Sequence, residues 1–158
     1  MRRADREILD ENRIEQVIAG CQSLHLGLFD RAADEVYVVP LSFGYEKENG
    51  RYVFWFHGAS EGRKLELIRQ NGKAGFEMER GAVLKGGEMG CDWTTSFESV
   101  IGTGSIAPVQ TEQEKRHGLQ VIMRHLTGKA DWQFREDYVQ SVCVFRLEAE
   151  KLSCKIHL

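Results

Sequence analysis

Short runs of β-branched and aromatic residues, separated by turns, limit what this chain can fold into. The segment 46–50 predicts a hairpin turn between two of these runs. Pro40 cannot donate a ladder hydrogen bond, so its strand is expected to have an edge or a bulge there. About six strands with few helices predict a mainly β fold, a small antiparallel barrel with flanking helices. The expected strands are 24–30, 35–46, 51–57, 73–80, 94–109 and, as one or two closing strands, 138–158.

Three segments have the spacing of amphipathic helices. The first has Asn12 as a candidate N-cap, and the third opens with a capping box formed by Thr111 and Glu114. The second runs from about residue 61 to residue 71, and Gly72 is placed to end it. The Gly-rich segment 81–91 is expected to be a loop. The side chains expected to face the core are Ile14, Val17, Ile18, Cys21, Leu65, Ile68, Leu119, Ile122, Met123 and Leu126.

Composition excludes several classes of protein. The net charge is -3 and the 21 Lys and Arg residues are scattered, which gives no basic surface for nucleic acid. No apolar run approaches the roughly 20 residues that span a bilayer, and the charged N-terminus lacks the apolar segment of a signal peptide. We expect a soluble cytoplasmic protein that binds neither nucleic acid nor membrane, with residues 1–158 in one domain.

Metal and thiol chemistry are not indicated. The four cysteines form no C-x-x-C pair, and Cys91 is interpreted as a plain thiol. His117 and His125 lie eight residues apart without a neighbouring ligand at metal-site spacing. The sequence also has no Rossmann, Walker or nucleophile-elbow motif. We therefore predict no metal site.

One stretch places cations where a helix usually avoids them. An aromatic strand ends at His57, Gly58 allows a close backbone approach, and Ser60 is a candidate cap for the helix that follows. Arg63 and Lys64 lie in its first turn, at the positive end of the helix dipole. Together with the free N–H groups of that turn they make a candidate phosphate site. The alternative is a solvated first turn with two surface cations, and the residues alone leave both open.

Five segments together resemble a known superfamily over nearly the full length of the chain. They are "MRRADREI", "VVPLSFGYE", "FHGASEGRKLELI", "CDWTTSFESVIGTGSI" and "TEQEKRHGLQVIMRHLTG". Their order and spacing resemble the pyridoxamine 5'-phosphate oxidase-related, FMN-binding split-barrel superfamily, and most closely its 5-nitroimidazole resistance (Nim) branch.

The resemblance implies a homodimer with FMN between the subunits. It implies that the FMN phosphate is held by Gly62, Arg63 and Lys64. The segment of Pro40, Leu41, Ser42 and Phe43 would run along the flavin ring, and His57 and Ala59 would approach the flavin and its ribityl chain. Trp93 and Ser99 would reach the cofactor from the partner subunit.

Two departures from the Nim pattern affect this assignment. Ser42 stands where Nim-like sequences often carry Asn, and the C-terminal segment reads Ser153-Cys154-Lys155 in place of Thr-Gly-Lys. Trp93 also fits a core or interface aromatic, and His57 alone fits a structural histidine. Related split barrels bind haem or the deazaflavin F420, so the fold does not fix the cofactor.

The function expected from the resemblance is that of an FMN-dependent oxidoreductase. It would pass electrons from a reduced nicotinamide to a small electron-poor substrate such as a nitroaromatic, with the redox chemistry supplied by the flavin. His57 would donate a hydrogen bond or a proton to the acceptor. The alternatives are a split barrel that holds flavin or haem without turnover, and a scaffold whose pocket has lost its ligand.

Overall fold

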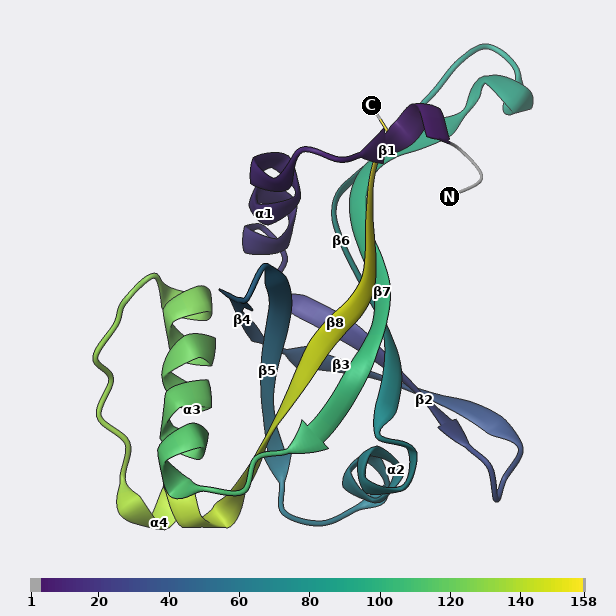
Figure 1. The fold of residues 1–158 in the computed structure, drawn as a ribbon. Helices are drawn as coiled ribbons and strands as arrows, with labels where there is room; N and C mark the ends of the chain where they lie inside the picture. The colour runs from purple at the N-terminus through teal and green to yellow at the C-terminus, as the bar shows by residue number, and fades with distance from the viewer. Residues whose placement is uncertain (1–3, 158) are drawn as a thin grey trace.

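The computed structural model describes residues 4–157, so the first three residues of the segment "MRRADREI" and the C-terminal residue lie outside it. Strands make up most of the regular structure in the described range (Figure 1). They are β1 (Glu7–Ile8), β2 (Ser23–Asp30), β3 (Glu35–Ser42), β4 (Gly44–Glu48), β5 (Arg51–Ala59), β6 (Lys73–Lys85), β7 (Thr94–Pro108) and β8 (Val142–His157). The helices are η1 (Ala4–Arg6), α1 (Glu11–Ala19), α2 (Arg63–Asn71), η2 (Gly90–Asp92), α3 (Glu112–Thr127) and α4 (Glu136–Ser141).

The strands form one antiparallel sheet in the order β3-β2-β6-β7-β8-β5-β4, with β1 added to β8. Its two end strands, β3 and β4, are consecutive in the chain and separated only by Phe43. The sheet therefore curls back on itself into a barrel whose end strands meet without a ladder between them (Figure 1). The predicted mainly β fold, a split barrel with flanking helices, is confirmed.

Two apolar clusters hold this barrel together. The first fills the interior, where Phe54 and Phe56 of β5 pack with Phe145 of β8 and with residues of α1 and α2. The second lies outside the barrel, where Val53 and Trp55 of β5 pack under α3 and α4. Because successive side chains of a strand point to opposite faces, β5 is buried on both. Its position is therefore fixed more tightly than that of an edge strand such as β3.

The helix ends agree only in part with the sequence. The capping box of Thr111 and Glu114 is confirmed, and Gly72 ends α2 in the left-handed conformation with φ of 62°. Asn12 is not the N-cap of α1. Asp10 takes that role, because its carboxylate accepts hydrogen bonds from the Asn12 and Arg13 N–H groups. Ser60 does not cap α2 either, since Gly62 is the N-cap and no side chain caps the helix.

Most side chains expected to face the core are buried, but the inner face of α3 is placed differently. Met123 is only partly buried and Leu126 is exposed. Gly118 and Val121 take their place beside Leu119 and Ile122. The reason is that α3 lies against the outer face of β4 and β5 along its 118–122 side, with Gly118 beside Trp55 and Val121 beside Gly44. None of the helices within residues 4–157 is long and apolar enough to cross a bilayer.

Three strand predictions were wrong in detail. The segment 81–85 is not loop but the end of β6, which passes an irregularity between Arg80 and Val83 and pairs again with β7. The run at 35–46 is divided into β3 and β4, because the Phe43 side chain turns fully into the core. Residues 138–141 belong to the helix α4 and not to a strand, whereas the prediction of one or two closing strands is confirmed by the single strand β8. Buried Val139 holds α4 against α3.

Candidate functional site

The barrel is open along one edge of β5. Strand β4 pairs only with Arg51–Trp55, whereas β8 pairs with the other edge of β5 as far as Ala59. The last four residues of β5 thus leave one edge unpaired, and α2 starts directly beyond them. We call the region formed by β3, the residues 56–59 of β5 and the first turn of α2 the split. It contains most of the residues implied by the family resemblance.

Arg63 connects α2 to the hairpin of β2 and β3. Its guanidinium donates to the Asp30 carboxylate, with Nη2–Oδ2 at 2.8 Å and Nε–Oδ2 at 3.1 Å, and also to Glu35. The guanidinium carbon lies 5.0 Å from the centre of the Tyr37 ring. The hydrogen bond from Arg63 holds the pKa of Asp30 below its ordinary value. Two carboxylates therefore balance the charge of Arg63, a pairing that the sequence analysis missed because no spacing links residues 30, 35 and 63.

Lys64 is the cation of the split without a carboxylate. Within residues 4–157 no Asp or Glu oxygen lies within 4.0 Å of its ammonium group. Its Nζ lies 5.6 Å from the centre of the Phe145 ring and so close to Gly58 that a Cβ there would stand 2.8 Å away. Burial lowers the pKa of this half-buried lysine. An anion at the start of α2 would therefore meet an uncompensated charge.

Gly62 gives the start of α2 its shape. Its φ of 109° is one that side-chain-bearing residues rarely adopt, and a Cβ there would meet open space. The Leu65 and Glu66 N–H groups donate to the Gly62 carbonyl, and because no side chain caps the helix, the N–H groups of Arg63 and Lys64 are left for another acceptor. The backbone and Lys64 together give this turn the donor set of a phosphate site.

His57 lies at the end of β5 in a half-buried position. Its ring faces the ring of Tyr138 on α4, with centroids 6.5 Å apart. Burial lowers the pKa of His57 below its ordinary 6.5, and the positive charge of Lys64 lowers it further. The imidazole is therefore neutral at neutral pH, with one N–H donor and one acceptor nitrogen.

The remaining candidate residues fall into two groups. Pro40 and Ser42 are exposed on β3, and Ala59 is exposed at the end of β5. Leu41 packs partly against the core and Phe43 is fully buried, so Phe43 offers a ligand only its backbone. Trp93 and Ser99 do not join them within one chain. Trp93 directly follows η2, in the segment that connects β6 to β7 (Figure 1), and is 52% exposed. Ser99 lies within β7 opposite Glu79 of β6 and Lys155 of β8.

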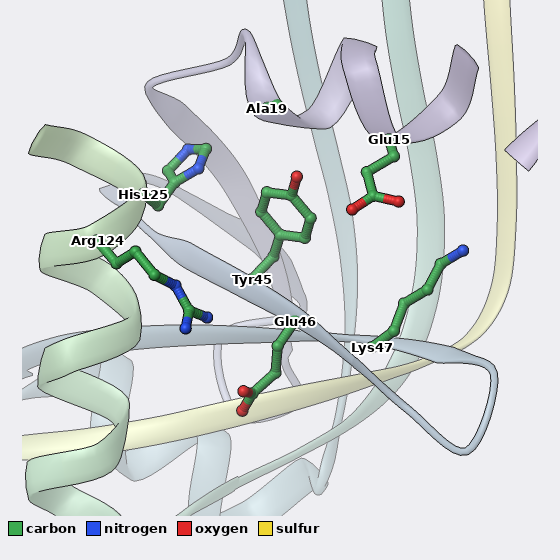
Figure 2. Close-up of a pocket in the computed structure, with 7 residues that line it drawn as sticks. All are labelled: Glu15, Ala19, Tyr45, Glu46, Lys47, Arg124 and His125. Carbon is green, nitrogen blue, oxygen red and sulfur yellow. The ribbon is translucent and has the colours of Figure 1, made fainter. Parts of the chain in front are cut away.

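Apart from the split, a cavity of about 390 Å³ lies between α1, β4 and α3 (Figure 2). Its polar groups mainly join these elements to one another. The His125 Nε2 donates to the Cys21 carbonyl at 2.8 Å, and Glu46 accepts from the Trp55 indole at 2.8 Å. Lys47 reaches Glu11 of α1 at 3.0 Å. Sequence reasoning missed this cavity because its lining comes from three distant segments. Within residues 4–157 no group of His, Cys, Asp and Glu could hold a metal ion.

The two half-buried histidines give a test of the electrostatics. NMR titration should give His57 a pKa below 6.5, and Lys64→Met should raise it toward 6.5 because a neighbouring positive charge is removed. His125 is the internal control, since burial lowers its pKa with no contribution from Lys64. An unchanged His57 pKa in Lys64→Met would contradict the assignment. Because the unfolded histidines take up protons first, stability should fall as the pH drops below 6.5.

Comparison with known proteins agrees with this fold. Residues 10–156 match the family described as pyridoxamine 5'-phosphate oxidase. The comparison with curated proteins gives no significant match. Among solved structures, a candidate 5-nitroimidazole antibiotic resistance protein from Bacteroides thetaiotaomicron is 29% identical, with a TM-score of 0.80 over 95% of this chain and 86% of that one.

Two further structures share the fold at lower identity. The flavocytochrome Anf3 from Azotobacter vinelandii has a TM-score of 0.79 at 16% identity, over 100% of this chain and 72% of that one. An FAD- and haem-binding protein from Mycobacterium smegmatis has a TM-score of 0.78 at 12% identity, over 96% and 73% of the two chains. The family match covers most of the chain and the fold agrees with it, so the chain belongs to the pyridoxamine 5'-phosphate oxidase family.

Proposed function

We propose that the protein is an FMN-dependent oxidoreductase of the Nim type, which passes electrons from a reduced nicotinamide to a small electron-poor acceptor such as a nitroaromatic. The observation that carries this proposal is Lys64, a half-buried cation without a carboxylate at the uncapped start of α2. The solved structure of the candidate 5-nitroimidazole resistance protein supports the choice of acceptor. The Azotobacter and Mycobacterium proteins support a flavin as the cofactor class.

The residues of the split fit the parts of FMN. The Lys64 side chain and the backbone N–H groups of Arg63 and Lys64 would hold the phosphate. Arg63 would contribute as well, but it would share its donors between the phosphate and the carboxylates of Asp30 and Glu35. The exposed face of β3 offers Pro40 and Ser42 to the flavin ring, with Leu41 and the Phe43 backbone beside them, and Ala59 would lie near the ribityl chain.

His57 would bind the acceptor as a neutral hydrogen-bond donor. When bound, FMN would supply the redox chemistry, since no side chain of the split carries electrons. With its pKa lowered by burial and by Lys64, the His57 ring holds no extra proton at neutral pH. It can therefore orient an acceptor through its N–H group and stabilise negative charge that develops there.

A second candidate function is to bind a flavin or haem without catalytic turnover. The observation in its favour is that two structures with this fold are a flavocytochrome and an FAD- and haem-binding protein. The colour of the purified protein separates the cofactors, because flavin absorbs in its own bands and haem gives a Soret band. Turnover with a nicotinamide then separates an enzyme from a carrier.

The protein is proposed to act as a homodimer. A flavin ring needs two walls to be largely buried, and the split of one chain offers β3 and β5 on one side only. A two-fold interface would supply the second wall twice, with Trp93 and Ser99 contributed by the partner. Light scattering should therefore give a mass of two chains of 18.0 kDa each. A monomer that holds FMN tightly would contradict the dimer.

The phosphate assignment predicts a contrast between FMN and riboflavin. Lys64→Met removes a charge-assisted hydrogen bond that contributes roughly 1.5–3 kcal/mol. FMN affinity should then fall by about ten- to a hundred-fold, whereas riboflavin, which lacks the phosphate, should bind weakly and equally to both proteins. Lys73→Met is the control, because it removes the same charge from an exposed lysine that lies just after α2. Equal losses for both ligands would indicate general damage to the split.

The activity itself is tested with the flavin-loaded protein. Under anaerobic conditions, NADH or NADPH should bleach the flavin bands, and a 5-nitroimidazole should restore them. His57→Gln should slow the second step more than the first, because His57 is assigned to the acceptor. If neither NADH nor NADPH reduces the flavin, the proposal is overturned in favour of a protein that binds the cofactor without turnover.

A further inference from the structure

A cavity of about 350 Å³ lies at the end of the barrel where several elements converge. It is bounded by the turn from β5 to α2, by α2, by the end of β7, and by α3, α4 and the start of β8. It lies beside the split, because Val142, Cys143 and Val144 of its lining pair with His57–Ala59 of β5. No residue of the split lines it, and α4 borders both, with Tyr138 near His57 and Gln140 in the cavity lining. The lining residues are Ser60, Arg69, Pro108, Val109, Gln110, Lys115, Gln140, Val142, Cys143 and Val144.

The cavity has two cations and no carboxylate in its lining. The Arg69 side chain makes no ion pair or hydrogen bond within the described part of the chain. Lys115 donates to the Val139 carbonyl at 2.8 Å, which uses one of its three N–H donors. Two carboxylates, Glu112 and Glu136, accept from Gln140 of the lining and pair with Arg116. With Arg69 and Lys115, three cations face these two carboxylates, so one positive charge remains.

One wall of the cavity is apolar. Pro108 and Val109 end β7, and Val142 and Val144 begin β8, with the Val109 N–H fixed to the Val144 carbonyl at 3.0 Å. The side chains of this wall form no hydrogen bonds, so they would contribute nothing to the binding of an inorganic ion. A planar carboxylate matches the fork of an arginine, and an apolar body matches the valines and the proline.

We propose that this cavity binds a small organic carboxylate, with the carboxylate on Arg69 and Lys115 and its apolar body against Val142, Val144 and Pro108. The volume suits a ligand at the small end of the range for protein sites. The site is independent of the cofactor proposed for the split, because none of the residues assigned to FMN lines it.

Cys143 provides a reporter inside the cavity. Cys21 and Cys154 are buried and Cys91 is exposed, so a Cys91→Ser background leaves Cys143 as the partly exposed thiol of the described chain. Its alkylation by neutral iodoacetamide, followed at alkaline pH because burial raises the Cys143 pKa, reports occupancy. Benzoate is the probe, and benzamide is its neutral match.

Benzoate should protect Cys143 from alkylation at concentrations where benzamide does not. Arg69→Gln should raise the benzoate concentration needed for half-protection by about ten-fold, the effect of losing one charge-assisted hydrogen bond. Arg124→Gln is the matched control. It removes an arginine at the other end of α3 that makes no ion pair within the described residues, and should leave protection unchanged.

Four results would overturn the proposal. Equal protection by benzoate and benzamide would leave an apolar cavity without charge recognition. Protection by inorganic phosphate as strong as that by benzoate would remove the role of the apolar wall. If Cys143 does not react, benzoate binding to the same variants is measured by calorimetric titration. The absence of benzoate binding at millimolar concentration would overturn the proposal, and so would an unchanged affinity in Arg69→Gln. None of these results depends on flavin binding, so they stand apart from the proposed function.

Discussion

The burial of β5 on both faces is the constraint on which the rest of the structure depends. Phe54 and Phe56 are fixed inside the barrel, and Val53 and Trp55 are fixed under α3. A strand held on both sides can keep an unpaired edge at its end without fraying. That edge, at residues 56–59, holds His57 beside the start of α2. The barrel can thus stay open at this edge because a strand that is buried on both faces forms one side of the opening.

The electrostatics of the split follow from how two neighbouring cations are partnered. Arg63 is balanced by Asp30 and Glu35 and joins α2 to the hairpin of β2 and β3, so its first role is structural. Lys64 has no such partner, and its positive charge adds to the effect of burial in lowering the pKa of His57. The helix dipole adds to the same positive field. Two cations that look equivalent in sequence therefore differ in their partners: Arg63 forms ion pairs within the chain, and Lys64 is the group proposed to bind the phosphate.

What the sequence could predict was local. Strand alternation, the box of Thr111 and Glu114, and the left-handed Gly72 each depend on residues a few positions apart, and the structure agrees. The helix at 136–141 was missed because six residues carry no clear period, and tertiary contacts decide their conformation. The partners of Arg63 and the cavity beside Arg69 were missed for a related reason. Their residues meet only when the sheet has curled, and no spacing records that.

The short helix α4 shows how the two sites depend on one packing arrangement. A helix of six residues is not stable by itself, so its place is set by α3. Lys115 binds the Val139 carbonyl, Arg116 binds Glu136, and the Val139 side chain is buried in the outer cluster. The same helix carries Tyr138 toward His57 and Gln140 to the cavity lined by Arg69. Contacts between α3 and α4 thus fix both the position of Tyr138 beside His57 and that of Gln140 in the cavity lining.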